Sequence, residues 1–150
     1  MKYFLVAFAF LFLISCADDD SPKDYTAENE QEILDYIEDN NLDATATGSG
    51  LYYVINNQGA GEQPTTNSNV TVAYKGYFTN DAVFDQSNAA GISFNLQQVI
   101  AGWTEGIPYF NEGGDGVLLI PSHLGYGNDG RGSIPGGAVL IFDVTLISVN

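Results

Sequence analysis

Short apolar runs separated by glycine- and asparagine-rich turns fill most of the chain after residue 50. The runs lie at residues 51–56, 70–78, 83–85, 117–120 and 139–149. In the second run, apolar Val70 and Val72 flank polar Thr71, as expected of a half-buried strand. Runs of β-branched and aromatic residues bounded by turn residues predict strands, so we expect about five.

One segment between these strands has helical spacing. Residues 94–106, FNLQQVIAGWTEG, hold the only tryptophan of the chain. Apolar positions recur on one face of a short helix at Val99, Ile100, Trp103 and Ile107. Gly102 and Gly106 lower the helix propensity, so packing must hold this helix in place. A tryptophan in such a position is more often a core residue than a site residue.

A second, amphipathic helix is predicted within residues 26–47. Thr26 is a suitable N-cap, and Asn40 with Asn41 ends the pattern. The apolar face consists of Ile33, Leu34 and Ile37. Together the elements predict an α+β fold in which a mostly antiparallel twisted sheet of about five strands wraps one short helix. This domain is expected to span residues 48–150.

The first sixteen residues resemble the signal peptide of bacterial lipoproteins. Lys2 precedes an apolar run at residues 3–14, which is too short to span a membrane, and the segment ends in Leu-Ile-Ser-Cys. In lipoproteins the cysteine, here Cys16, is lipidated. The alternative is an ordinary secretory signal that contains a chance cysteine. Residues 17–25 are acidic and predict a linker. We therefore expect a protein of the cell envelope, lipid-anchored at the periplasmic or surface face of the outer membrane.

Charge and composition exclude several classes of function. The chain has four basic and nineteen acidic residues. Removal of the signal segment would remove Lys2 and no acidic residue, which leaves a net charge of −16 (3 − 19). Nucleic-acid binding is excluded because it requires basic patches against phosphate. The only histidine is His123, expected at the surface, and Cys16 is the only cysteine. Because no cluster has metal-ligand spacing and no glycine-rich phosphate loop follows a strand, we expect no cofactor and no metal.

Five motifs occur in an order that resembles the FKBP-type peptidyl-prolyl cis/trans isomerases. They are VTVAYKGYF at 70–78, VFD at 83–85, VIAGWTEG at 99–106, LLIPSHLGYG at 118–127 and SIPGGAVLIFDVTL at 133–146. The resemblance covers residues 50–150 and implies an FKBP-like fold and isomerase activity. Gly136 stands where the family usually has a second proline, which implies a more mobile loop at this point.

The resemblance also implies a role for each pocket residue. Trp103 would form the floor under the substrate proline, and Asp85 would bond with Tyr74. The backbone N–H of Ile100 and the hydroxyl of Tyr126 would hold substrate carbonyls. The walls would be Tyr74, Phe84, Val99, Ile100 and Phe142, with Ile92 and Ile134 as further substrate contacts.

The implied partners are proline-containing unfolded or extended polypeptides, and the protein is expected to be a monomer. Two other functions use the same residues. A chaperone could bind proline peptides in this pocket without catalysis. A surface adhesion or carbohydrate-binding lipoprotein would instead present its aromatic side chains on an open face.

Overall fold

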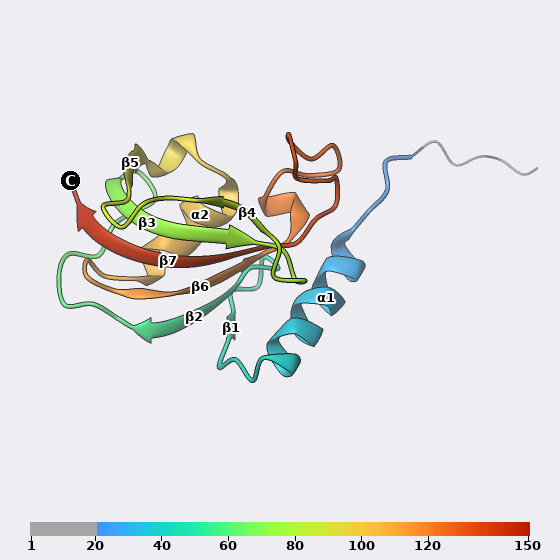
Figure 1. Ribbon diagram of the computed structural model, residues 1–150, viewed down its shortest axis with the longest axis horizontal. Coiled ribbons are helices and arrows are strands. Elements are labelled where there is room, and N and C mark those ends of the chain that lie inside the picture. The colour runs from blue at the N-terminus through green and yellow to red at the C-terminus, as the bar shows by residue number, and fades with distance from the viewer. Residues whose placement is uncertain (1–20) are drawn as a thin grey trace, which may run out of the picture.

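A computed structural model describes residues 21–150 (Figure 1). The predictions for the signal segment, for lipidation of Cys16 and for the first part of the acidic linker lie outside these residues. In the described part of the chain, no helix is long and apolar enough to cross a membrane.

An antiparallel sheet of seven strands forms the body of the domain. The strands are β1 (Thr45–Ala46), β2 (Tyr52–Asn57), β3 (Asn69–Tyr77), β4 (Val83–Gln86), β5 (Ile92–Asn95), β6 (Asp115–Ile120) and β7 (Leu140–Val149). Their order is β1-β2-β6-β7-β3-β4, and β5 pairs with β3. The long strands β3 and β7 lie side by side in the middle, from Val70 opposite Val149 to Tyr77 opposite Ile141.

The five predicted strands are all present, but β1 and β5 were not predicted. β1 has only two residues, too few for a periodic pattern. β5 has the sequence ISFN and lies just before the tryptophan helix, and its residue Phe94 was assigned to the helical segment. The count of about five strands was therefore low by two edge strands.

The central helix is shorter than predicted. Residues 94–100 continue from β5 into a 3-10 turn at Leu96–Gln98, in which the Asn95 side chain accepts a hydrogen bond from Gln97 N. Helix α2 begins only at Ala101 and ends at Gly106, followed by a second 3-10 turn at Ile107–Tyr109. The apolar residues before Ala101 thus enter the core from an extended segment, although their spacing is also that of a helical face.

Two glycines allow α2 to lie against β6. A Cβ atom on Gly102 would lie 2.5 Å from Cγ2 of Ile120, and one on Gly106 would lie 2.7 Å from Cδ2 of Leu118. Both distances are shorter than van der Waals contact. The residues that weaken the helix by propensity are therefore the ones that permit its packing, and Trp103 and Ile107 are buried in the same core.

Helix α1 (Thr26–Asp39) packs on the other side of the sheet through fully buried Ile33, which joins Val54, Leu119 and Val139. Leu34, predicted to lie on the apolar face, is 40% exposed.

The start of α1 differs from the prediction. Tyr25 occupies the N-cap position, and Thr26 is the first helical residue. The Thr26 N–H donates to Oδ1 of Asp24 at 2.9 Å. Hydrogen bonding to Thr26, first by its side chain and then by its backbone N–H, lowers the pKa of the Asp24 carboxyl. The helix ends at Asp39, and Asn40 caps it as predicted.

The contact between α2 and β6 predicts the effect of filling it. Gly102→Ala should lower the free energy of unfolding by about 1–3 kcal/mol, because the added methyl group overlaps Ile120. Urea denaturation measures this change. Ala101→Ser adds an atom at an exposed position of the same helix and is the control. Equal stability of the two variants would contradict the tight packing.

Candidate active site

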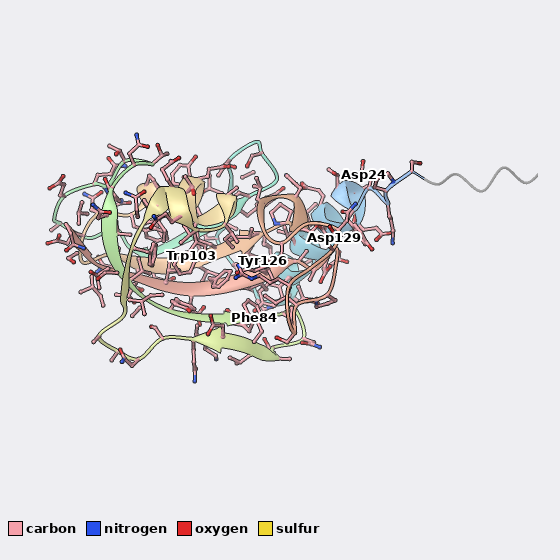
Figure 2. The ribbon with its side chains drawn as sticks, turned by 90° about the horizontal axis from the view of Figure 1, so that it is seen from above. Asp24, Phe84, Trp103, Tyr126 and Asp129 are labelled. Atoms are coloured by element: carbon pink, nitrogen blue, oxygen red, sulfur yellow. The ribbon has the colours of Figure 1, made fainter. Side chains whose placement is uncertain are left out.

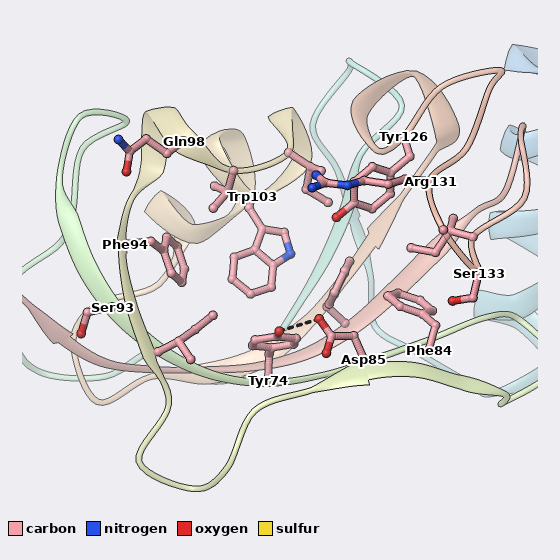
Figure 3. Close-up of a pocket in the computed structure, with 16 residues that line it drawn as sticks. Tyr74, Phe84, Asp85, Ser93, Phe94, Gln98, Trp103, Tyr126, Arg131 and Ser133 are labelled. Carbon is pink, nitrogen blue, oxygen red and sulfur yellow. Dashed lines mark hydrogen bonds between the residues drawn. The ribbon is translucent and has the colours of Figure 1, made fainter.

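A cavity of about 760 Å³ opens beside α2, between the sheet and the loop that joins β6 to β7 (Figure 3). We call this loop, residues 121–139, the flap. The cavity is lined by Tyr74, Phe84, Asp85, Ile92, Ser93, Phe94, Gln98, Val99, Ile100, Trp103, Tyr126, Arg131, Gly132, Ser133, Ile134 and Phe142. These sixteen residues include all ten pocket residues predicted from the sequence. Six of the lining residues are aromatic, and these six side chains therefore surround one cavity.

Trp103 lies at the base of the cavity and is 5% exposed. Its ring meets Tyr74 at 5.1 Å and 84° and Phe142 at 5.2 Å and 83°, both edge-to-face, which is a favourable geometry for aromatic pairs. Phe94 packs on it at 5.3 Å. These contacts fix the plane of the indole ring.

The indole nitrogen of Trp103 is buried and has no hydrogen-bond partner among the described residues. Figure 3 shows this nitrogen on the side of the ring nearer Tyr126. A buried donor without a partner is uncommon, because desolvation without a hydrogen bond is unfavourable.

A glycine in β3 makes room for one wall. A Cβ atom on Gly76 would lie 2.7 Å from Cε1 of Phe142 and from Cε2 of Phe84. In its absence the rings of Phe84 and Phe142 meet edge-to-face at 5.5 Å and 86°, above the strand. Phe78 supports Phe84 from outside the cavity, at 4.9 Å. The wall is therefore built on the pairing of β3 with both β4 and β7.

The predicted bond between Tyr74 and Asp85 is present. The Tyr74 hydroxyl donates to Oδ2 of Asp85 at 2.7 Å (Figure 3). Oδ1 of the same carboxylate accepts from Gln86 N at 2.9 Å. Burial, followed by the hydrogen bond and the negative charge of Asp85, raises the pKa of Tyr74 to about 12. Tyr74 therefore stays neutral at physiological pH and continues to donate.

Ile100 is held at the start of α2. Its carbonyl accepts from Trp103 N at 2.9 Å and from Thr104 N at 3.2 Å, so it caps the helix. Thr104 Oγ1 also donates to Leu96 O at 2.5 Å, tying α2 back to the preceding turn. Ile100 and Val99 thus present their backbone and side chains to the cavity from a fixed, extended segment.

Six lining residues were not predicted: Ser93, Phe94, Gln98, Arg131, Gly132 and Ser133. Phe94 was assigned to a helix; recognising β5 would have placed it on the same strand as Ile92. The flap residues have no periodic pattern that could place them. Arg131 is the only basic residue of the lining, and its guanidinium lies 5.9 Å from the centre of the Tyr126 ring.

His123 is exposed, as expected, and its Nε2 lies 2.8 Å from Ser49 O. Among residues 21–150 there is no group of three potential metal ligands. The lining consists mainly of aromatic and aliphatic side chains, with Asp85 and Arg131 as its charged residues.

The sequence and the fold are similar to those of known proteins. The family model of FKBP-type peptidyl-prolyl cis-trans isomerases matches residues 60–147. FkpA of Escherichia coli K12, named as such an isomerase, is 38% identical over 127 residues, which are 82% of this chain and 47% of that protein. FkpA of Buchnera aphidicola subsp. Schizaphis graminum is 43% identical over 106 residues, 69% of this chain and 42% of that protein.

Solved structures of such isomerases are also similar to this fold. The crystal structure of FkpA from Escherichia coli has a TM-score of 0.74 at 36% identity, covering 83% of this chain and 61% of that one. A peptidyl-prolyl isomerase from Pseudomonas syringae pv. tomato has a TM-score of 0.73 at 28% identity, covering 87% and 98% of the two chains.

The fold is therefore FKBP-like, and the chain belongs to the FKBP-type peptidyl-prolyl cis-trans isomerase family. It spans less than half the length of the curated FkpA relatives that it matches.

The Tyr74–Asp85 pair predicts a pH dependence of stability. Since the folded chain holds the Tyr74 proton to about pH 12 and the unfolded chain releases it near pH 10, the free energy of unfolding should fall as pH rises between these values. Tyr74→Phe should reduce this fall, measured by urea denaturation at pH 9 and pH 11. Tyr109→Phe, which removes a hydroxyl outside the cavity, is the control. An identical fall in wild type and Tyr74→Phe would contradict the shifted pKa.

Proposed function

We propose that this protein is a peptidyl-prolyl cis-trans isomerase that accelerates rotation about X–Pro bonds in polypeptides. The observation that carries the proposal is the aromatic cavity that the ten residues predicted from the family resemblance line together, with Trp103 at its base. Membership of the isomerase family also supports it. The reaction, the substrates and the roles of the individual residues below are all part of this proposal.

The chemistry of the X–Pro bond explains why such a cavity is sufficient. Resonance gives the amide C–N bond partial double-bond character, so rotation costs about 18–20 kcal/mol. The planar amide places negative charge on its oxygen, and water stabilises this polar form. An apolar cavity removes water and thereby favours the twisted, less polar state. Because the cis and trans forms of X–Pro are nearly equal in free energy, only the barrier has to be lowered.

Each residue of the cavity has a role in binding the substrate. The proline ring lies on Trp103, between the walls formed by Tyr74, Phe84, Val99, Ile100 and Phe142, with Ile92 and Ile134 at the rim. The Ile100 N–H and the Tyr126 hydroxyl hold the substrate carbonyls on either side of the rotating bond. Asp85 fixes the Tyr74 ring through the 2.7 Å hydrogen bond and so holds the wall in place. No side chain exchanges a proton with the substrate.

The polypeptide substrates are proline-containing chains in an unfolded or extended state, since an X–Pro bond must be exposed to enter the cavity. Residues 48–150 form the isomerase domain, α1 and its connection (26–47) form an attachment to it, and the protein acts as a monomer.

An isomerisation assay with a short X–Pro peptide tests the function. The protein should accelerate cis-to-trans conversion, and Trp103→Leu should lower kcat/KM by about tenfold or more, which is a barrier increase of at least about 1.4 kcal/mol. Leu119→Ala removes a fully buried side chain from the other face of the sheet and is the control for lost stability.

A folded protein that binds the peptide but does not accelerate its isomerisation would contradict the enzymatic function. It would favour a chaperone that holds proline-containing segments. Loss of activity in Leu119→Ala equal to that in Trp103→Leu would instead show that the effect of Trp103→Leu comes from lower stability and not from the cavity.

We further propose that Cys16 is lipidated and anchors the protein to the outer membrane of the cell envelope. The support is the sequence of residues 1–16, which ends in Leu-Ile-Ser-Cys. Cys16→Ser should release the protein from the membrane fraction of the producing cells, measured by fractionation and immunoblotting. Ser15→Ala, which keeps the cysteine, is the control. Continued membrane association of Cys16→Ser would contradict the anchor.

A further inference from the structure

The flap supplies five of the sixteen residues that line the cavity, yet it has little regular structure. They are Tyr126, Arg131, Gly132, Ser133 and Ile134. Apart from a 3-10 turn at Ser122–Leu124, an isolated bridge between Arg131 and Ile134 is its only regular pairing. Gly127 and Gly130 adopt positive φ angles. A segment of this kind needs contacts with other elements to keep one position.

One side chain of α1 joins the two ends of the flap. Asn29 is 1% exposed; its Nδ2 donates to Gly137 O at 2.9 Å, and its Oδ1 accepts from Ser122 N at 2.8 Å. The two partners lie fifteen residues apart, one just after β6 and the other just before β7. Only a side chain with both a donor and an acceptor can make the two bonds, which is the property of an amide. We call this pair of bonds the Asn29 clamp.

Two further contacts join the start of α1 to the flap. Asn128 Nδ2 donates to Lys23 O at 2.7 Å. The Tyr25 ring packs on Gly137, where a Cβ atom would lie 2.3 Å from Cε1 of the ring. Figure 2 shows Asp24 and Asp129 at the same end of the molecule, where the chain enters α1. The flap is therefore held from outside the cavity.

Helix α1 provides a fixed base for this clamp. Ile33, one turn after Asn29, is fully buried against the sheet. The Tyr52 hydroxyl donates to Oε1 of Glu30 at 2.5 Å, and Thr79 Oγ1 donates to Oε1 of Glu32 at 2.6 Å. These bonds join the helix to β2 and to the turn between β3 and β4, so that α1 connects the flap to the sheet. Figure 1 shows α1 at the end of the sheet from which the flap extends.

We propose that Asn29 is a positioning residue of the active site: it fixes the flap over the cavity and thereby sets the affinity for the proline-containing segment. The inference rests on the proposed isomerase function. Asn29 lies outside residues 60–147, the part of the chain matched by the family model. Helix α1 is then a component of substrate binding as well as an attachment to the domain.

Kinetics on the full chain test the clamp. Asn29→Asp keeps the shape and the acceptor for Ser122 N but places a carboxylate oxygen against Gly137 O. KM for the X–Pro peptide should rise about five- to tenfold, because one buried hydrogen bond worth about 1–1.4 kcal/mol is lost. The value of kcat should change less than about twofold. Asn128→Ala, at an exposed site, should raise KM in the same direction by a smaller factor.

Tyr52→Phe is the matched control, because it removes a hydrogen bond of α1 that does not involve the flap. It should lower stability without changing KM. A rise in KM for Tyr52→Phe equal to that for Asn29→Asp would overturn the proposal, as would an unchanged KM in folded Asn29→Asp and Asn128→Ala.

A second measurement does not depend on catalysis. Trp103 is the only tryptophan and lies beneath the flap, so acrylamide quenching of its fluorescence reports how well the flap covers the cavity. Quenching should increase in Asn29→Asp and stay at the wild-type value in Tyr52→Phe. If the wild-type protein does not accelerate isomerisation, the proposed function fails, and the quenching measurement alone tests the clamp. Unchanged quenching in Asn29→Asp would then overturn the proposal that Asn29 positions the flap.

Discussion

The close approach of α2 to β6 is the contact on which the rest of the site depends. Gly102 and Gly106 remove the side chains that would hold the helix away from Ile120 and Leu118. At this distance Trp103 reaches the rings of Tyr74 and Phe142, which stand on the two central strands. A helix lying further out would leave the indole unsupported by either ring, and the cavity would lose its base. One packing distance thus sets both the stability of the core and the geometry of the proposed site.

The mechanism proposed for the cavity explains why it has so few ionisable groups. A cavity that acts by removing water needs a fixed apolar surface, and rigidity comes here from edge-to-face aromatic contacts and one tyrosine–carboxylate hydrogen bond. Asp85 serves this purpose through its position beside Tyr74. The strong negative charge of the protein lies mainly outside the cavity, where it favours solubility and leaves the apolar lining unaffected.

Much of this could be predicted from the sequence, and the exceptions have physical causes. The alternation around Val72 and the runs ending in β7 predicted the main strands, and the order of five motifs located the ten residues that meet in the cavity. The boundary of α2 could not be found, because Val99 and Ile100 have helical spacing but belong to an extended segment fixed by the Asn95 cap. Arg131 and Asn29 were missed for another reason: flap positions and long-range side-chain bonds have no local pattern.

The strand order has a consequence for how the chain acquires its fold. β7 lies between β3 and β6: its residues 141–149 pair with β3, and its residues 140–145 pair with β6. Before residues 140–149 are available, β3 and β6 each lack a central neighbour, and the sheet consists of two separate pieces. Pairings between strands about seventy residues apart form slowly, because a long loop must close first. The sheet should therefore be completed only after synthesis has passed β7, so that the cavity, whose wall includes Phe142 of β7, forms late.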